Sequence, residues 1–269
     1  MILMTDWLLV KTGVSFFIFT TFLQIVLSLT RVPSPCIELK IEGGNGMLMK
    51  CLPAAILITG LSYIFLIPEE PLTIKILFKV LPMLLILLYA RTNVGRQGRY
   101  QSLILLGLFF CMLGDGLLIW FVIGLSAFLI GHLFYISAFF GRWNFSWLRF
   151  ATILPISIYS TWISHEIVHS LIEKGEHNLI IPVICYVTVI SLMGWAAFMT
   201  GNAAAIIGGL LFMISDSILS WNKFIDDVAF SGPLIMLTYY AAQFCIANSI
   251  RKKPSFHVSR GLKSERPIQ

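Results

Sequence analysis

Residues 107–120 read GLFFCMLGDGLLIW, an apolar run interrupted by a single acidic residue, Asp115. Apolar runs of about 18 or more residues recur along the whole chain and are typical of membrane spans. Of the 269 residues, 58% are hydrophobic and 12% are charged. A soluble protein carries about twice that charged fraction. The sequence therefore predicts an all-α protein, a polytopic bundle of transmembrane helices.

Nine candidate spans follow from the length of about 20 apolar residues that crosses a bilayer. They cover residues 7–29, 51–67, 73–90, 101–121, 123–140, 149–172, 179–199, 203–220 and 228–249. Arginine and lysine gather in every second loop, and the positive-inside rule then places the C-terminus in the cytosol. The net charge of +6 is spread between the apolar runs, so it favours orientation in a membrane over binding to nucleic acid.

A second stretch, GGLLFMISDSILSW (208–221), aligns with the first on its own acidic residue, Asp216. Glycine, methionine, leucine and tryptophan recur at the same distances from the two aspartates. The two helices are four spans apart and cross the membrane in the same direction. Both aspartates are therefore expected at similar depth, near the non-cytosolic end. The pattern is typical of a parallel internal repeat, with chance similarity between apolar helices as the alternative.

Ionisable groups inside a span are costly, at roughly 3 kcal/mol each on the mild insertion scale. Two aspartates at matched depth indicate a functional site, and helix–helix pairing is the alternative. Lys79, on a helix of opposite direction, is expected near the same level. There it would neutralise one carboxylate and leave the other able to hold a proton. A lysine that extends to the interface is the second interpretation of this residue.

Several polar residues are candidates for lining the same cavity or for bonding between helices. They are His132, Tyr135, Tyr239, Tyr240 and Gln243. Asn222 and Lys223 follow Trp221 at the expected membrane interface. At that level they would either meet a phosphate head group or anchor the helix.

His165, Glu166 and His169 match the H-E-x-x-H pattern, which places two histidines on one helical face with a glutamate as base. Zinc needs a third ligand, which Asp216 would have to supply from another helix. The pattern lies at the end of its span beside the polar loop 173–178, where histidine and glutamate cost little. An intramembrane zinc metallohydrolase is therefore the less favoured interpretation.

Five segments, in order, resemble the YhhN family of multi-span membrane proteins. They are KVLPM (79–83), GLFFCMLGDGLLIW (107–120), GHLFYISAFF (131–140), GLLFMISDSILSWNKF (209–224) and LIMLTYYAAQ (234–243). The resemblance implies a catalytic domain of eight family-type spans in residues 47–250. An additional N-terminal span and a cytosolic loop would precede it in residues 1–46, and a basic cytosolic tail would follow in residues 251–269.

Animal members of that family are lysoplasmalogenases of the endoplasmic reticulum, so the resemblance implies the same activity and location here. They hydrolyse the sn-1 vinyl ether bond of a lysoplasmalogen to a fatty aldehyde and glycerophosphoethanolamine or glycerophosphocholine. The family's two essential intramembrane aspartates correspond to Asp115 and Asp216. We expect acid catalysis by this pair, tuned by Lys79, with a lysophospholipid and membrane lipids as partners and no metal or organic cofactor.

A membrane transporter and a non-catalytic lipid-binding protein are the alternatives from other functional classes. A transporter also keeps paired charges near the middle of the membrane, and a parallel repeat is common among transporters. Release of aldehyde from a lysoplasmalogen would distinguish the hydrolase from both.

Overall fold

A computed structural model describes residues 45–67, 71–93 and 98–251 of the chain. Within these ranges the elements are all helical, in the order α2 (Asn45–Phe65), α3 (Leu72–Thr92), α4 (Arg99–Leu117), α5 (Phe121–Phe140), α6 (Trp147–Ala151), α7 (Ile153–Glu173), η1 (His177–Leu179), α8 (Ile180–Met199), α9 (Ala203–Phe224) and α10 (Ser231–Asn248). The expected first span, residues 7–29, lies outside the described residues.

The outer surface of the helices is apolar. In the described ranges, α3, α4, α5, α9 and the segment His177–Met199 are long and apolar enough to cross a membrane. Large side chains such as Leu77, Ile158 and Ile181 are 69%, 71% and 73% exposed. In water a surface of this kind would drive aggregation, whereas in a bilayer it contacts lipid tails. The chain is an integral membrane protein with an all-helical bundle, as the apolar runs predicted.

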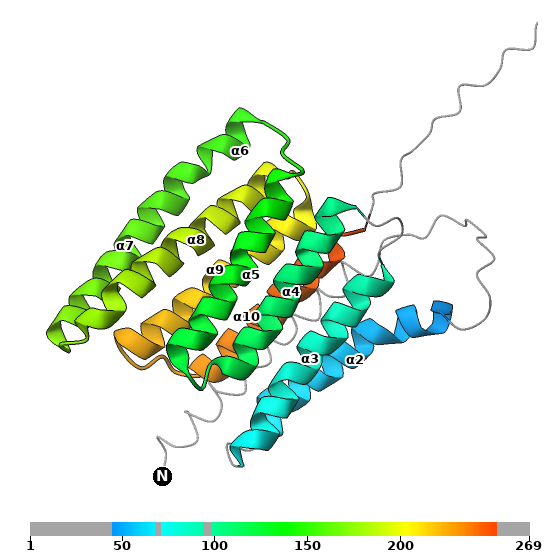
Figure 1. The fold of residues 1–269 in the computed structure, drawn as a ribbon, viewed down its shortest axis with the longest axis horizontal. Helices are drawn as coiled ribbons and strands as arrows, with labels where there is room; N and C mark the ends of the chain where they lie inside the picture. The colour runs from blue at the N-terminus through cyan, green and yellow to red at the C-terminus, as the bar shows by residue number, and fades with distance from the viewer. Residues whose placement is uncertain (1–44, 68–70, 94–97, 252–269) are drawn as a thin grey trace, which may run out of the picture.

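The long helices lie side by side with their axes roughly aligned (Figure 1). α7 lies at one edge and α2 at the other, with α4, α5, α9 and α10 between them (Figure 1). α4 packs on α5 and α9 packs on α10, while α5 contacts α8 and α10 contacts α3. The contacts of α3, α4 and α5 thus have counterparts among α8, α9 and α10, which is the packing that a parallel internal repeat predicts.

Small residues allow the paired helices to approach closely. A Cβ atom added at Gly107 of α4 would overlap the ring of Tyr135 on α5. A Cβ atom added at Gly208 of α9 would lie 3.0 Å from the carbonyl oxygen of Ala242 on α10. Because lipid tails are as apolar as the helices, close van der Waals packing of this kind holds the pairs together.

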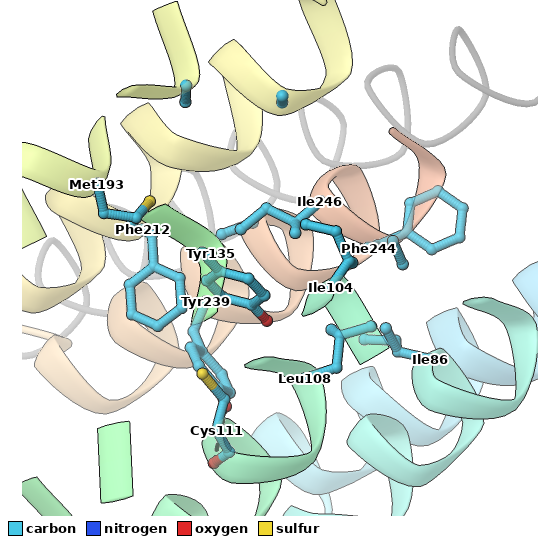
Figure 2. Packing of buried hydrophobic residues seen from close by; sticks show 14 of the residues in the cluster. Ile86, Ile104, Leu108, Cys111, Tyr135, Met193, Phe212, Tyr239, Phe244 and Ile246 are labelled. Carbon is cyan, nitrogen blue, oxygen red and sulfur yellow. Dashed lines mark hydrogen bonds between the residues drawn. The ribbon is translucent and has the colours of Figure 1, made fainter. Parts of the chain in front are cut away.

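The centre of the bundle is an apolar and aromatic core to which both halves contribute. Figure 2 shows side chains of six helices meeting there, among them Ile86, Leu108, Tyr135, Met193, Phe212 and Ile246. Tyr239 and Cys111 lie together at one margin of this core (Figure 2), with the tyrosine hydroxyl 3.5 Å from the cysteine carbonyl oxygen. The core therefore fixes the position of Tyr239, which reaches from α10 to α4.

One expected span is divided in the structure. Residues 149–172 were predicted as a single helix, but α6 ends at Ala151 and α7 begins at Ile153. Pro155 accounts for the break, because its nitrogen has no hydrogen to donate and its ring clashes with the carbonyl group four residues earlier. That carbonyl group belongs to Ala151, the last residue of α6.

α9 continues to Phe224, four residues beyond its predicted end at residue 220. The hydroxyl of Ser170 donates a hydrogen bond to the Phe224 carbonyl oxygen, and Lys174 Nζ donates to the same oxygen at 2.6 Å. Side chains from α7 thus satisfy a carbonyl group that a helix end leaves without a partner, and the last turn of α9 is retained.

Candidate active site

Both aspartates line one cavity of about 170 Å³ inside the bundle. Its charged and polar side chains are Tyr63, Lys79, Asp115, Tyr186, Ser215, Asp216 and Tyr239. Apolar side chains, including Leu118, Leu125, Phe128 and Leu219, form much of the remainder. The structure thus brings together Lys79, Asp115 and Asp216, the three charged residues that the sequence placed at one membrane level.

Asp115 is held by a cation and a hydroxyl group. Lys79 Nζ lies 3.4 Å from its Oδ1 atom, and the Tyr239 hydroxyl donates to Oδ2 at 2.6 Å. The side chain of Asp115 is 2% exposed and that of Lys79 is 14% exposed. Tyr240 donates to the backbone carbonyl oxygen of Lys79 at 2.8 Å, which ties α10 to α3. These contacts give a buried carboxylate the charge partner and hydrogen bonds that it needs to stay ionised.

Asp216 has a different environment. Tyr186 of α8 donates a hydrogen bond to its Oδ2 atom. In the described part of the chain, no ion pair involves Asp216. A buried carboxyl group without a cation is held more easily in its neutral form, because burial disfavours the charge. The cavity therefore contains two carboxyl groups in different surroundings: Asp115 has a cation and a hydroxyl group beside it, and Asp216 has a hydroxyl group.

Asp216 and Tyr186 also border a second cavity, of about 20 Å³, between α7, α8 and α9. Its lining includes four serines, Ser160, Ser191, Ser217 and Ser220. A space of this size accommodates about one water molecule when polar groups surround it. Asp216 is thus accessible from two spaces with different linings.

Four of the predicted site residues lie in the core and do not line the cavity: His132, Tyr135, Tyr240 and Gln243. Tyr135 donates to Gln243 Oε1 at 2.6 Å, which joins α5 to α10 in the core. His132 is fully buried, and its ring meets those of Phe212 and Tyr186 edge-on at centroid distances of 4.6 and 5.6 Å. His132 therefore contacts the tyrosine that binds Asp216 and does not face the cavity.

Asn222 and Lys223 have separate environments at the end of α9. Asn222 Oδ1 accepts a hydrogen bond of 2.9 Å from the backbone N–H of Val228, which closes the loop towards α10. Lys223 is exposed, with Nζ 4.4 Å from the ring centre of Phe121. Neither residue lines the 170 Å³ cavity.

The H-E-x-x-H pattern lies on an exposed part of α7. His165 Nδ1 is 3.6 Å from Glu166 Oε1, and His169 Nδ1 is 3.6 Å from Glu173 Oε2. Among the residues that the structure describes, no three His, Cys, Asp or Glu side chains are grouped to hold a metal ion. Asp216 therefore does not complete a zinc site with these two histidines.

Three polar residues of the cavity lining, Tyr63, Tyr186 and Ser215, were not predicted from the sequence, and Tyr186 contacts an aspartate. A tyrosine inside a span is inexpensive, so it does not stand out as a buried aspartate does. The available signal was the hydroxyl group itself, which lies in the mostly apolar stretch 180–190 and needs a partner inside the bundle.

Comparison with known proteins covers the region that contains this cavity. A model of the YhhN family matches residues 74–250. Lysoplasmalogenase TMEM86B of Rattus norvegicus is 31% identical over 200 residues, which span 72% of this chain and 81% of that protein. Its Homo sapiens counterpart is 32% identical over 192 residues, spanning 70% and 80% of the two chains. Lysoplasmalogenase TMEM86A of Homo sapiens is 33% identical over 211 residues, spanning 71% and 84%. No solved structure gives a significant match.

Proposed function

The chain belongs to the YhhN family, and on that premise we propose that it is a lysoplasmalogenase. It hydrolyses the sn-1 vinyl ether bond of lysoplasmalogens in the membrane of the endoplasmic reticulum, with its C-terminal tail in the cytosol. One observation carries the proposal: a single cavity contains a carboxyl group paired with lysine and a second one that has no ion pair among the described residues.

Vinyl ether chemistry requires this difference. The bond resists base but hydrolyses once a proton is added to the carbon β to the oxygen, which creates an oxocarbenium ion. Water attacks that ion, and the resulting hemiacetal separates into an aldehyde and an alcohol. The catalyst needs one protonated carboxyl group to donate the proton and one carboxylate to stabilise the cation. Glycosidases meet a related oxocarbenium-like transition state with two carboxyl groups as well.

The two environments support one assignment of the roles. Asp216, which has a hydroxyl partner and no ion pair in the described part of the chain, is the proton donor. Asp115, which has Lys79 at 3.4 Å and Tyr239 at 2.6 Å, is the carboxylate that faces the oxocarbenium ion. Tyr186 and Tyr239 are positioning residues, because the hydroxyl group of each donates a hydrogen bond to one of the two aspartates.

The protons balance over the cycle. Asp216 transfers its proton to the vinyl carbon and becomes a carboxylate. Water then bonds to the oxocarbenium carbon and gives a proton to Asp216, which restores the acid. The hemiacetal breaks its bond to the glycerol oxygen as the hydroxyl proton is transferred to that oxygen. The second cavity, lined by Asp216 and four serines, is placed to supply the water from outside the substrate cavity.

The surroundings of the aspartates suit the substrate. A lysoplasmalogen has its head group at the membrane surface and its vinyl ether just inside the hydrocarbon layer. Leu118, Leu125, Phe128 and Leu219 offer an apolar lining for the start of the alkenyl chain. The same side chains exclude bulk water, which strengthens the interaction between a carboxylate and an oxocarbenium ion.

The test is aldehyde release from 1-alkenyl-glycerophosphoethanolamine by the purified full-length protein in phospholipid nanodiscs. We expect release by the wild-type protein and by Asp226→Asn, a matched control in the exposed loop between α9 and α10. Asp115→Asn and Asp216→Asn should lose activity while eluting as the same species in gel filtration.

Absence of aldehyde from the wild-type protein, or full activity in both site variants, would overturn the proposal. A transporter would instead exchange labelled lipid across liposomes by counterflow without forming product. A lipid-binding protein would retain lysoplasmalogen unchanged.

A further inference from the structure

A groove next to the substrate cavity ends at Lys223. Its lining consists of Phe121, Leu125, Val183, Tyr186, Val187, Leu219, Ser220, Lys223 and Phe224, and we name it the lysine groove. Leu125, Tyr186 and Leu219 line both the groove and the 170 Å³ cavity. The two spaces are therefore adjacent. The groove measures about 20 Å³, so a ligand that extends from the aspartates to the lysine must push apart the side chains that line it.

Lys223 is a cation placed to bind an anion. Its ammonium group lies 4.4 Å from the ring centre of Phe121, and this cation–π contact holds it over the groove. Among the described residues no carboxylate lies within ion-pair distance of Lys223. The hydroxyl group of Ser220 lines the same groove and offers a hydrogen-bond donor.

The spacing between Lys223 and Asp216 matches the substrate. The two residues are seven apart on α9, which is two helical turns, so they share a face about 10 Å apart along the axis. In a lysoplasmalogen, seven single or double bonds separate the protonated vinyl carbon from phosphorus. At the projection of about 1.3 Å per bond in an extended chain, that distance is about 9 Å.

The geometry points to Lys223 as the binding site for the phosphate of the lipid head group. This inference rests on the proposed function and adds a specificity residue to it. With the phosphate at Lys223, the glycerol backbone passes Leu219 and Tyr186, and the vinyl carbon reaches Asp216. The lysine thus selects phosphate-bearing lipids and fixes the depth at which the vinyl ether stops.

The polar residues near Lys223 already have hydrogen-bond partners within the protein. The side-chain oxygen of Asn222 accepts the backbone N–H of Val228 at 2.9 Å, so it holds the loop. Lys174 also lies near the end of α9, but its ammonium group donates to the carbonyl oxygen of Phe224 at 2.6 Å. Because Lys174 holds the last turn of α9, the control is instead Asp226, an exposed charged residue in the loop after α9 that does not line the groove.

The test compares two substrates that differ only in the phosphate-bearing head group: 1-alkenyl-glycerophosphoethanolamine and 1-alkenylglycerol. The readout is the ratio of their kcat/KM values for aldehyde release in nanodiscs. A charge-assisted hydrogen bond to phosphate is worth about tenfold or more in binding. Lys223→Met should therefore lower the ratio about tenfold, mainly through KM for the phosphate-bearing substrate. Lys223→Arg should restore most of the ratio, and Asp226→Asn should leave it within about twofold of wild type.

The outcomes separate this inference from the proposed function. If neither substrate yields aldehyde with the wild-type protein, the proposed function itself fails. If both yield aldehyde but Lys223→Met changes the two kcat/KM values equally or not at all, the head-group site is wrong. Competition by inorganic phosphate that exceeds competition by glycerophosphoethanolamine would indicate a free-phosphate site and would also overturn the assignment.

Discussion

The aspartates of α4 and α9 occupy matched places in two similar sequences, yet their neighbours differ. Asp115 has a lysine from α3 and a tyrosine from α10. Asp216 has a tyrosine from α8 and borders a second cavity lined by serines. The two segments supply two carboxyl groups to one cavity, and the helices packed around them give Asp115 a cation and, among the described residues, give Asp216 a hydroxyl partner and no ion pair.

This difference shows which helices determine the chemical properties of the two aspartates. Two identical carboxyl groups in one buried cavity would share a proton, because like charges close together cannot both ionise easily. A single cation at Lys79 removes that symmetry. The assignment of roles therefore depends on the helices that flank the aspartates more than on the repeated segments.

The largest effect is expected at Asp216. Replacing it by asparagine removes the proton donor, and general acid catalysis contributes about 10² to 10⁴-fold, so kcat should fall about 10³-fold. Asp216→Glu retains an acid and should keep a measurable fraction of activity. Steady-state aldehyde release in nanodiscs measures both variants, and equal activity in Asp216→Asn and Asp216→Glu would refute a proton-transfer role.

The second effect concerns the ion pair. Lys79→Met leaves Asp115 without its cation, and kcat should fall about 10 to 100-fold, while Lys79→Arg should restore much of the rate. Asp115→Asn leaves a buried cation unpaired, which destabilises a protein interior by roughly 3 kcal/mol or more. The double variant Lys79→Met/Asp115→Asn should therefore melt at a higher temperature than Asp115→Asn alone and yet remain inactive. A double variant less stable than either single variant would mean that the pair is not a coupled unit.

A smaller effect separates the two tyrosines. Tyr186→Phe removes the hydrogen bond to Asp216, whereas Tyr239→Phe leaves Asp115 with Lys79. We expect kcat to fall about tenfold in Tyr186→Phe and about threefold in Tyr239→Phe, with KM little changed in both, because a single hydrogen bond contributes about that much. The reverse order would show that Tyr239, and not the lysine, controls Asp115.

The smallest effect on rate is expected from the glycines that pair the helices. Gly107→Ala forces the Tyr135 ring to move, and Gly208→Ala meets the backbone of α10. Overpacking of this kind destabilises by roughly 1 to 3 kcal/mol, so both variants should melt at lower temperature. Gly116→Ala is the control, since its Cβ would contact only Val80 at 3.9 Å. Equal melting temperatures for Gly107→Ala and Gly116→Ala would contradict the close contact of α4 with α5.

The charges and apolar lengths predicted much of this arrangement. Asp115, Asp216 and Lys79 stood out because a buried charge is costly, and the loop charges placed them at one level. The sequence also contains a signal for the break after Ala151, because Pro155 lies four residues later.

The hydroxyl groups that contact the aspartates could not be predicted in the same way. Whether Tyr186 or Tyr135 faces an aspartate depends on how each helix is rotated about its axis, and neighbouring helices decide that through packing. Tyr135 instead pairs with Gln243 in the core. Among the polar residues inside the spans, the sequence therefore predicted the charged members of the site better than the neutral ones.

The central claim, proton transfer to carbon within the two-aspartate cavity, is tested most directly by hydrolysis in D₂O. Purified protein in nanodiscs converts 1-alkenyl-glycerophosphoethanolamine, and mass spectrometry locates deuterium in the fatty aldehyde. The account predicts one deuterium on the carbon next to the aldehyde group in the wild-type product, and a loss of that product in Asp216→Asn. Aldehyde formed without deuterium at that carbon, or formed at the wild-type rate by Asp216→Asn, would contradict it.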